Sequence, residues 1–293
     1  MEAKTALANR ILVVHARHEP FSHVPYVIHL LADEWRARGI PVEVADSISE
    51  PTGSDVLVFP HLDLTVTPPR LGEQLSRCAR VLNRAVSDIS KRAISRQLVS
   101  SPDEYDGPVI VKTNLNFGGW PESRLLANRG GEVARQLDSA WKEVPWTVSG
   151  MIRCEQYPIY DDPRKVPPRV WRNDRLVVEK FLPEREGEFY CLRQYIFLGQ
   201  SEINTRSISA DPRVKSRGVV RREILEETPP QVRAFREKLG FDYGKFDYVL
   251  HGDDVIIFDV NRTFTYDSAS KAGSASSLLM TLADGIMPFL GRS

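Results

Sequence analysis

The sequence lacks the charge excess and the long hydrophobic runs that mark whole classes of protein. Its 39 basic and 39 acidic residues cancel to a formal net charge of zero, whereas a general nucleic-acid binder usually carries a basic excess. No hydrophobic run approaches the roughly 20 residues that span a bilayer. These absences argue against nucleic acids and membranes as partners.

Cysteine is also scarce. Cys78, Cys154 and Cys191 are odd in number, widely separated and without metal-ligand spacing, which is typical of reduced thiols rather than of a disulfide framework or a zinc site. The first apolar run, 11–14, is too short for the core of a signal peptide. We therefore expect a cytoplasmic protein.

Lysine is rare among the basic residues, of which 29 are arginine and ten are lysine. Because arginine usually serves static ion pairs and anion recognition while lysine is a compact point charge, each lysine is informative. No glycine-rich phosphate loop follows the first strand. Four histidines within 15–29 lack a repeated ligand spacing, which favours structural or substrate-lining roles over a metal site.

The N-terminal part of the chain predicts a parallel α/β unit. Residues 26–38 have helical spacing of apolar side chains, with Gly39 as the C-cap. Strands are predicted at 11–14, 41–45 and 55–59. A strand, a helix and a strand with short links form a parallel α/β unit, so residues 1–85 predict a small open-sheet lobe.

The rest of the chain predicts a mixture of helices and longer strands. Helices are expected at 88–98, 229–239 and 274–290, and strands at 109–112, 151–154, 176–182, 188–198, 202–208, 244–250 and 255–260. Residues 113–119 predict a flexible polar loop. The basic stretch 211–222 is either a mobile substrate loop or a solvated one.

The hairpin over 244–261 carries the sharpest local argument. A turn centred on Asp253 pairs residues whose numbers sum to 506, so Asp247 faces Asp259 and Lys245 faces Asn261. All four then project from one face. Opposed carboxylates repel each other unless a cation lies between them.

Two carboxylates and an amide oxygen are hard donors that suit Mg²⁺, with substrate phosphates and water completing the coordination. A lysine beside them would hold a phosphate or a developing oxyanion. The alternative is a solvated hairpin face, since a one-residue register shift sends these side chains to opposite faces. We expect the opposite face of the hairpin to pack against the core, because it carries the apolar residues Phe246, Tyr248, Leu250, Ile256, Phe258 and Val260.

Several segments, in this order, resemble the ATP-grasp superfamily. A Val-Lys pair that ends a strand and leads to Gly-Gly resembles the family's first nucleotide lysine and its phosphate-covering loop, at Lys112, Gly118 and Gly119. The lysine after Val-Leu-Asn and Ile-Ser resembles the other phosphate lysine, at Lys91. The match covers roughly residues 85 to 265.

The segment Val-Val-Glu-Lys-Phe-Leu resembles the family's adenine-binding stretch between the two lobes. The resemblance implies adenine contacts from Glu179, Lys180, Phe181 and Leu182. The family's ribose-binding carboxylate matches Glu188, with Glu184 as the alternative because three extra residues intervene.

Lys-x-Asp followed by Asp-x-Asn resembles the family's basic residue and metal ligands, at Lys245, Asp247, Asp259 and Asn261. The sequence departs from the family in two places. The family usually has Glu where this chain has Asp259, which implies a different metal placement or number. Arg262 and the next four residues replace the Pro-Gly turn that often follows the asparagine.

The resemblance implies a fold of class α/β and α+β, with an N-terminal open parallel α/β lobe followed by a two-lobed ATP-grasp domain. The expected domains are 1–85, then a first lobe over 86–178 with the phosphate-covering loop. The second lobe, 179–293, carries the adenine hinge and the metal hairpin.

The resemblance also implies an ADP-forming ligase. ATP would bind with one or two Mg²⁺ ions, or Mn²⁺, a carboxylate would attack the γ-phosphorus, and an amine or related nucleophile would displace phosphate from the acyl phosphate. Substrates could be small molecules or peptides, and a homodimer is left open. Lys245, Arg206 and Arg262 are candidate catalytic cations, and Arg193 and Arg206 are candidate substrate ligands, with surface ion pairs as the alternative for the arginines.

Two other functions stay open at this point. A phosphotransferase of the same fold would pass the phosphate to a hydroxyl group. A nucleotide-binding regulatory protein with little turnover would keep the fold without the ligase reaction.

Overall fold

The N-terminal part of the chain forms a parallel sheet in a computed structural model that describes residues 8–266 and 274–292. The strand order is β2-β1-β3-β4, and the strands are β1 (Arg10–Val14), β2 (Val42–Ala45), β3 (Val56–Pro60) and β4 (Arg80–Val81). Helices α1 (Val27–Ala37) and α2 (Pro69–Ser76) connect them. All five residues of β3 are buried, as expected for an inner strand of a parallel sheet covered on both faces. The predicted strand–helix–strand unit is confirmed.

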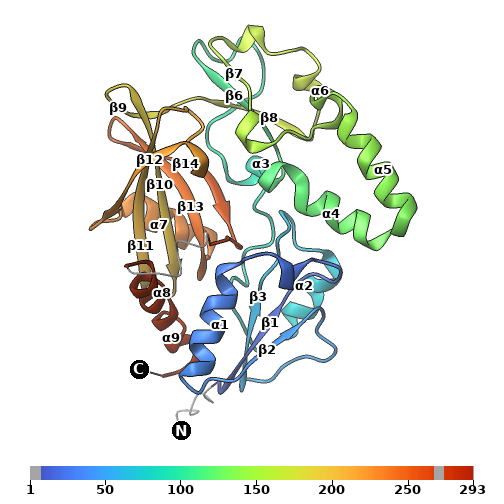
Figure 1. Cartoon of the computed structure of the whole chain (residues 1–293), viewed down its shortest axis with the longest axis vertical. Coiled ribbons are helices and arrows are strands. Elements are labelled where there is room, and N and C mark those ends of the chain that lie inside the picture. The colour runs from blue at the N-terminus through green and yellow to red at the C-terminus, as the bar shows by residue number, and fades with distance from the viewer. Residues whose placement is uncertain (1–7, 267–273, 293) are drawn as a thin grey trace.

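A second sheet is antiparallel, in the order β5-β8-β6-β7. Its strands are β5 (Leu98–Val99), β6 (Val109–Thr113), β7 (Ile159–Tyr160) and β8 (Leu176–Lys180), and the short helix α3 (Lys91–Ile94) precedes them. Helices α4 (Trp120–Arg129), α5 (Gly131–Glu143) and α6 (Trp146–Ser149) lie between β6 and β7 and arch away to one side of this sheet in Figure 1.

The third sheet is also antiparallel, in the order β12-β11-β10-β13-β14, with β9 paired to β10. Its strands are β9 (Glu184–Glu186), β10 (Phe189–Leu198), β11 (Ser201–Ser209), β12 (Val219–Leu225), β13 (Tyr243–His251) and β14 (Asp254–Asn261). Helix α7 (Pro230–Leu239) covers one face through Val232 and Phe235, which join the aromatic core of the sheet. Helices α8 (Ser274–Asp284) and α9 (Met287–Leu290) follow.

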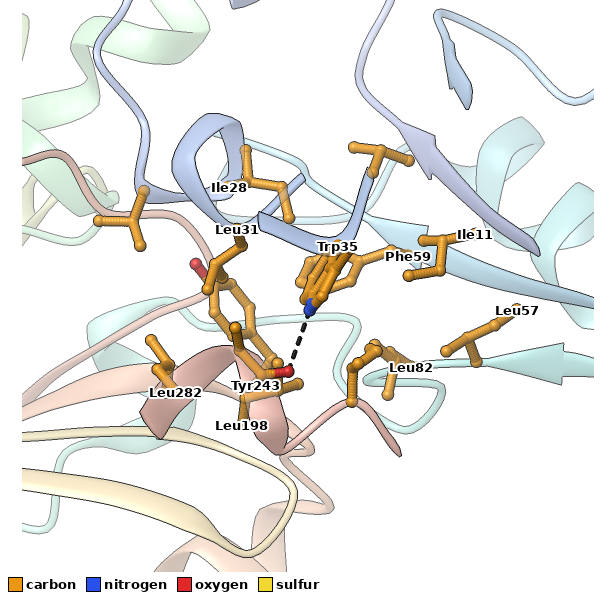
Figure 2. Close-up of a cluster of buried hydrophobic side chains, with 14 of the residues drawn as sticks. Ile11, Ile28, Leu31, Trp35, Leu57, Phe59, Leu82, Leu198, Tyr243 and Leu282 are labelled. Atoms are coloured by element: carbon orange, nitrogen blue, oxygen red, sulfur yellow. Dashed lines mark hydrogen bonds between the residues drawn. The ribbon is translucent and has the colours of Figure 1, made fainter. Parts of the chain in front are cut away.

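One hydrophobic core joins the first and third sheets. Trp35 of α1 is fully buried among residues of both, including Phe59 of β3 and Tyr243 of β13, as Figure 2 shows. Its indole N–H donates to the backbone carbonyl of Ala283, 3.0 Å away, at the end of α8. A buried indole needs such a partner, so this contact fixes α8 against α1.

Several predicted elements differ from the structure. The helix expected over 88–98 is only α3, because Ser95 leaves helical geometry and the chain enters β5, which pairs with β8. The strand expected over 151–154 is absent, and Cys154 begins a 3₁₀ turn. The basic stretch 211–222 belongs in part to strand β12. Helices α4 and α5 were not predicted. Among the described residues no helix is long and apolar enough to cross a membrane.

Candidate functional site

The β13–β14 hairpin opposes the two predicted carboxylates. Asp247 pairs with Asp259, and Lys245 pairs with Asn261, so the predicted register is confirmed at these four residues. We call them the hairpin face. The register arises differently from the prediction, because His251 pairs with Asp254 across a two-residue turn, and a bulge between Asp247 and Tyr248 then restores the pairing of the carboxylates.

The bulge also changes which residues face the core. Tyr248 pairs with Ile257, and both pack in the cluster that α7 covers. The prediction that Phe258 lies on the core side is therefore wrong. The same holds for Ile256, because neighbouring side chains on a strand point to opposite faces and Ile257 is on the core side. The ring of Phe258 instead lies 4.8 Å from the ammonium of Lys112.

Each carboxylate of the hairpin face has a lysine as its partner. Asp247 Oδ1 forms an ion pair with Lys245 Nζ, 3.2 Å away, and accepts a hydrogen bond from Gln194 Nε2 at 3.1 Å. Asp259 Oδ1 accepts from Lys91 Nζ at 3.1 Å. The lysines thus compensate the repulsion that two opposed carboxylates would otherwise suffer.

Lys91 is a buried cation at the centre of the candidate site. It begins α3, which Figure 1 shows near the place where the three sheets meet, and its side chain is only 4% exposed. Burial by itself would lower its pKa, but the negative charge of Asp259, with that of Glu179, outweighs burial and raises the pKa. Lys91 therefore carries a positive charge beside the hairpin face.

The loop after β6 is fastened to the same hairpin by Asn116. Its Oδ1 accepts from Lys91 Nζ at 3.1 Å, and its Nδ2 donates to the carbonyl of Val260 at 2.9 Å. Phe117, Gly118 and Gly119 then have positive φ. A Cβ at Gly118 would lie 2.5 Å from the carbonyl oxygen of Ile152, so only glycine fits there.

Lys112 and Glu179 form a buried ion pair on the second sheet. Lys112 Nζ lies 2.5 Å from Glu179 Oε2, and the Glu179 residue is 1% exposed. Glu179 Oε1 is buried and has no hydrogen-bond partner in the part of the chain that the structure describes. A buried acceptor without a donor is costly, so this oxygen is available to accept a hydrogen bond from a bound group.

The predicted adenine segment follows Glu179. The backbone N–H groups of Lys180 and Phe181 donate to Gln97 and Pro108, 2.8 Å away in each case. The Lys180 side chain turns to the ring of Tyr105 at 5.1 Å. Leu182 is half-buried, and Phe181 borders an open cavity of about 510 Å³ that Tyr160 and Tyr190 also line.

The structure does not bring Arg193, Arg206 and Glu184 to the hairpin face. Arg193 pairs with Arg206 across β10 and β11, and both guanidinium groups bind the Glu184 carboxylate at 2.8 and 3.0 Å. The neighbouring residue, Gln194, is the one that reaches Asp247. Because adjacent side chains on a strand point to opposite faces, the two arginines lie on the other face of the sheet.

Glu188 and Arg262 also lie apart from the hairpin face. Glu188 is exposed in the turn between β9 and β10. Arg262 is 3% exposed and donates to Thr67 Oγ1 at 2.7 Å and to the Leu64 carbonyl at 2.6 Å, which fastens β14 to the N-terminal lobe. Burial lowers the pKa of Arg262 to about 10.

Sequence reasoning missed three residues of the site. The position of Asn116, two residues before the Gly-Gly pair, could have indicated its place in the site. Gln194 could have been found because it follows Arg193 on the same strand and therefore points to the opposite face. The third, Tyr157, comes from an irregular segment and has no pattern of its own. Its hydroxyl lies 2.9 Å from Thr113 Oγ1, and burial raises its pKa to about 12.

Comparisons with known proteins show the fold. No protein-family model and no curated protein matches the chain. It is similar to the solved structure of a RiPP-associated ATP-grasp ligase from Chryseobacterium gregarium in complex with ADP and a leader and core peptide, at 10% identity and a TM-score of 0.54, covering 94% of this chain and 96% of that one. It is also similar to the ATP-grasp ligase PsnB in complex with a minimal precursor, at 14% identity and a TM-score of 0.50, covering 95% and 99% of the two chains.

The chain has the ATP-grasp fold. The predicted fold class is therefore confirmed. Residues 8–266 and 274–292 contain no group of three or more His, Cys, Asp and Glu side chains that could hold a metal ion. The hairpin face offers two carboxylates and one amide, which suits a cation that keeps phosphate oxygens and water among its ligands.

Proposed function

We propose that the protein is an ATP-dependent ligase that activates a carboxylate as an acyl phosphate, joins it to an amine or related nucleophile, and releases ADP and phosphate. The observation that carries this proposal is the direct pairing of Asp247 with Asp259, beside Lys245 and Asn261. The structural likeness to two ATP-grasp ligases supports the same class of reaction.

The buried lysines supply charge where a triphosphate needs it. Lys91 contacts Asp259 and Asn116, and Asn116 begins the turn with Gly118 and Gly119. We place the β- and γ-phosphates between Lys91, Lys112 and this turn. Lys245 then remains as the cation for the transferred phosphoryl group. In such a reaction catalysis is positioning and charge stabilisation.

The donor set of the hairpin face fits Mg²⁺, with Asp247, Asp259 and Asn261 as the residues that would hold it. When bound, the ion would neutralise the charge on the β- and γ-phosphate oxygens. Lys91 and Lys245 hold the two carboxylates in place. Asp259 has one methylene less than the glutamate usual in the family, so it brings the coordinating oxygens closer to β14.

We place the adenine base against Glu179. The unpartnered Oε1 of Glu179 can accept a hydrogen bond from the exocyclic amino group of adenine, with backbone groups of Lys180 and Leu182 beside the base. We retain Glu188 as the ribose-binding carboxylate, because Glu184 already accepts from two arginines and from the backbone N–H of Leu250.

Trapping the activated carboxylate tests this function. Incubation with ATP, Mg²⁺, hydroxylamine and a pool of amino acids and mixed peptides should yield a hydroxamate and equimolar ADP, because hydroxylamine intercepts acyl phosphates. ADP formed with a phosphorylated hydroxyl compound and no hydroxamate would show a phosphotransferase instead. Absence of ATP turnover with every pool would contradict both and favour a nucleotide-binding protein without turnover.

A further inference from the structure

Two carboxylates at the edge of the N-terminal sheet share one tyrosine hydroxyl. Glu19 lies in the loop after β1, and Asp63 lies in the loop after β3. Tyr26, just before α1, has its hydroxyl 2.7 Å from Asp63 Oδ2 and 3.3 Å from Glu19 Oε1. A single hydroxyl proton can serve only one of them fully, and the shorter distance assigns it to Asp63.

This arrangement sits where an open α/β sheet binds ligands. In the order β2-β1-β3-β4 the chain leaves β1 for β2 on one side and returns to β3 on the other. The carboxyl ends of β1 and β3 therefore border a topological switch point, where ligands of such sheets bind. Glu19 and Asp63 flank this point from its two sides.

Contacts connect the carboxylates with the hairpin face. Thr263, two residues after Asn261, donates its hydroxyl to Asp63 Oδ1 at 2.9 Å. The next residues pair with the N-terminal lobe, since Thr265 bridges to Tyr26 and the Phe264 carbonyl accepts from Val27. The segment that leaves the candidate metal site thus leads directly to the Tyr26 hydroxyl.

A small cavity, which we call the acidic recess, borders the two carboxylates. It has a volume of about 10 Å³ and is lined by Glu19, Asp63 and, from the middle of α4, Arg124. A cavity of this size has room for about one water molecule or one small polar group. The acidic recess therefore places two carboxylates and one guanidinium group around a single point.

We propose that Glu19, held with Asp63 through Tyr26, accepts a proton from a cationic amine, which is the nucleophile of the second half-reaction. This inference rests on the proposed ligase function and names its nucleophile. An acidic recess favours an ammonium group over a neutral hydroxyl or an anionic thiolate. The guanidinium group of Arg124, which lines the recess from α4, can bind an anionic part of the substrate.

The proton balance of the step is complete. The ammonium group loses one proton to the Glu19 carboxylate, and the free amine attacks the carbonyl carbon of the acyl phosphate. The C–N bond forms as the C–O bond to phosphate breaks, and the phosphate leaves with the electron pair. The second nitrogen proton leaves with it as hydrogen phosphate, which yields the amide.

The proton affinity of Glu19 suits this role. Burial, with the nearby negative charge of Asp63, raises the pKa of Glu19 to about 7. Its carboxylate is therefore half protonated near neutral pH, which is favourable for a general base. Among the described residues, Asp63 and Tyr26 act on Glu19, and Arg124 lines the same cavity. The rings of His29 and His61 lie against Tyr26, and burial lowers the pKa of His61.

The test compares two nucleophiles in one enzyme. With ATP, Mg²⁺ and the carboxylate pool, Glu19→Gln should still form hydroxamate, because hydroxylamine is largely uncharged at neutral pH. With methylamine, which is protonated, Glu19→Gln should lose about 100-fold or more of N-methylamide formation, the usual contribution of a general base. The exposed Glu50→Gln is the matched control and should behave as wild type.

The pH profile adds a readout that a purely structural role would not move. In the wild type, kcat/KM for methylamine should rise as pH rises through about 7, since Glu19 must lose its proton. Burial continues to raise the pKa of Glu19 in Asp63→Asn, but the added effect of the Asp63 charge is removed, so the inflection should move to lower pH. Glu19→Asp, which keeps a carboxylate, should retain part of the methylamine activity.

The outcomes separate the two proposals. Equal loss of hydroxamate and amide in Glu19→Gln, or an unshifted inflection in Asp63→Asn, would overturn the role of Glu19 while leaving the ligase function standing. A wild-type enzyme that forms no hydroxamate would contradict the ligase function, and the role of Glu19 with it.

Discussion

Replacing Asp259 by Asn is expected to reduce ATP-dependent turnover by about 10³-fold or more, as expected when a preorganised electrostatic group is lost, without unfolding the protein. Asp259 is one of two opposed carboxylates and the only acidic hydrogen-bond partner of Lys91 among the described residues. An amide keeps the shape and can still accept from Lys91, so the fold should survive. The charge that we propose to hold Mg²⁺ is lost.

Calorimetry with ATP and an increasing Mg²⁺ concentration measures the effect on binding. We expect Mg²⁺-dependent nucleotide binding in wild type and none in Asp259→Asn. The variant should still unfold cooperatively, at a lower temperature than the wild type, because buried Lys91 loses its counter-charge. The exposed Asp253→Asn in the turn of the same hairpin is the control. Kinetics like those of the wild type in Asp259→Asn would remove this residue from the metal site.

Lys112→Met is expected to weaken ATP binding by about 100-fold and to lower the free energy of unfolding by about 3–5 kcal/mol, the usual cost of breaking a buried ion pair. Both effects follow from one contact. Lys112 would serve the phosphates in the complex, and in this structure it neutralises Glu179, which is 1% exposed.

A second substitution separates the two effects. Lys112→Met combined with Glu179→Gln removes both charges, so most of the lost stability should return, while nucleotide binding should stay weak. Lys165→Met, at an exposed ion pair with Asp161, is the control for loss of a positive charge. Denaturant unfolding and nucleotide titration measure the two quantities. Restored nucleotide binding in the double variant would contradict the role of Lys112.

The hairpin shows how far sequence reasoning reaches. The pairing of Asp247 with Asp259 was predicted from a turn one residue different from the real one, and the bulge at Phe258 compensates for the difference. Alternation therefore located the carboxylates but misplaced Phe258. A bulge adds one residue to one strand, and the alternation of side chains along the chain does not reveal where it lies. In the folded protein the Phe258 ring lies beside Lys112 of another sheet.

The sequence located the lysines of the candidate site better than the arginines. Lys91 and Lys112 were predicted from the family resemblance and lie beside the hairpin face, but the long helix around Lys91 is wrong because tertiary pairing of β5 overrides local propensity. The roles of Arg193 and Arg206 were predicted from strand position alone. Their partner Glu184 comes from a separate strand, and such a contact depends on the sheet order.

A crystal structure with a nonhydrolysable ATP analogue and Mn²⁺, located by its anomalous signal, tests the central claim most directly. The account predicts the metal between Asp247, Asp259 and Asn261, with phosphates at Lys91 and Lys112 and the adenine amino group against Glu179. A metal and nucleotide bound elsewhere, with the lysines still paired to their carboxylates, would contradict it.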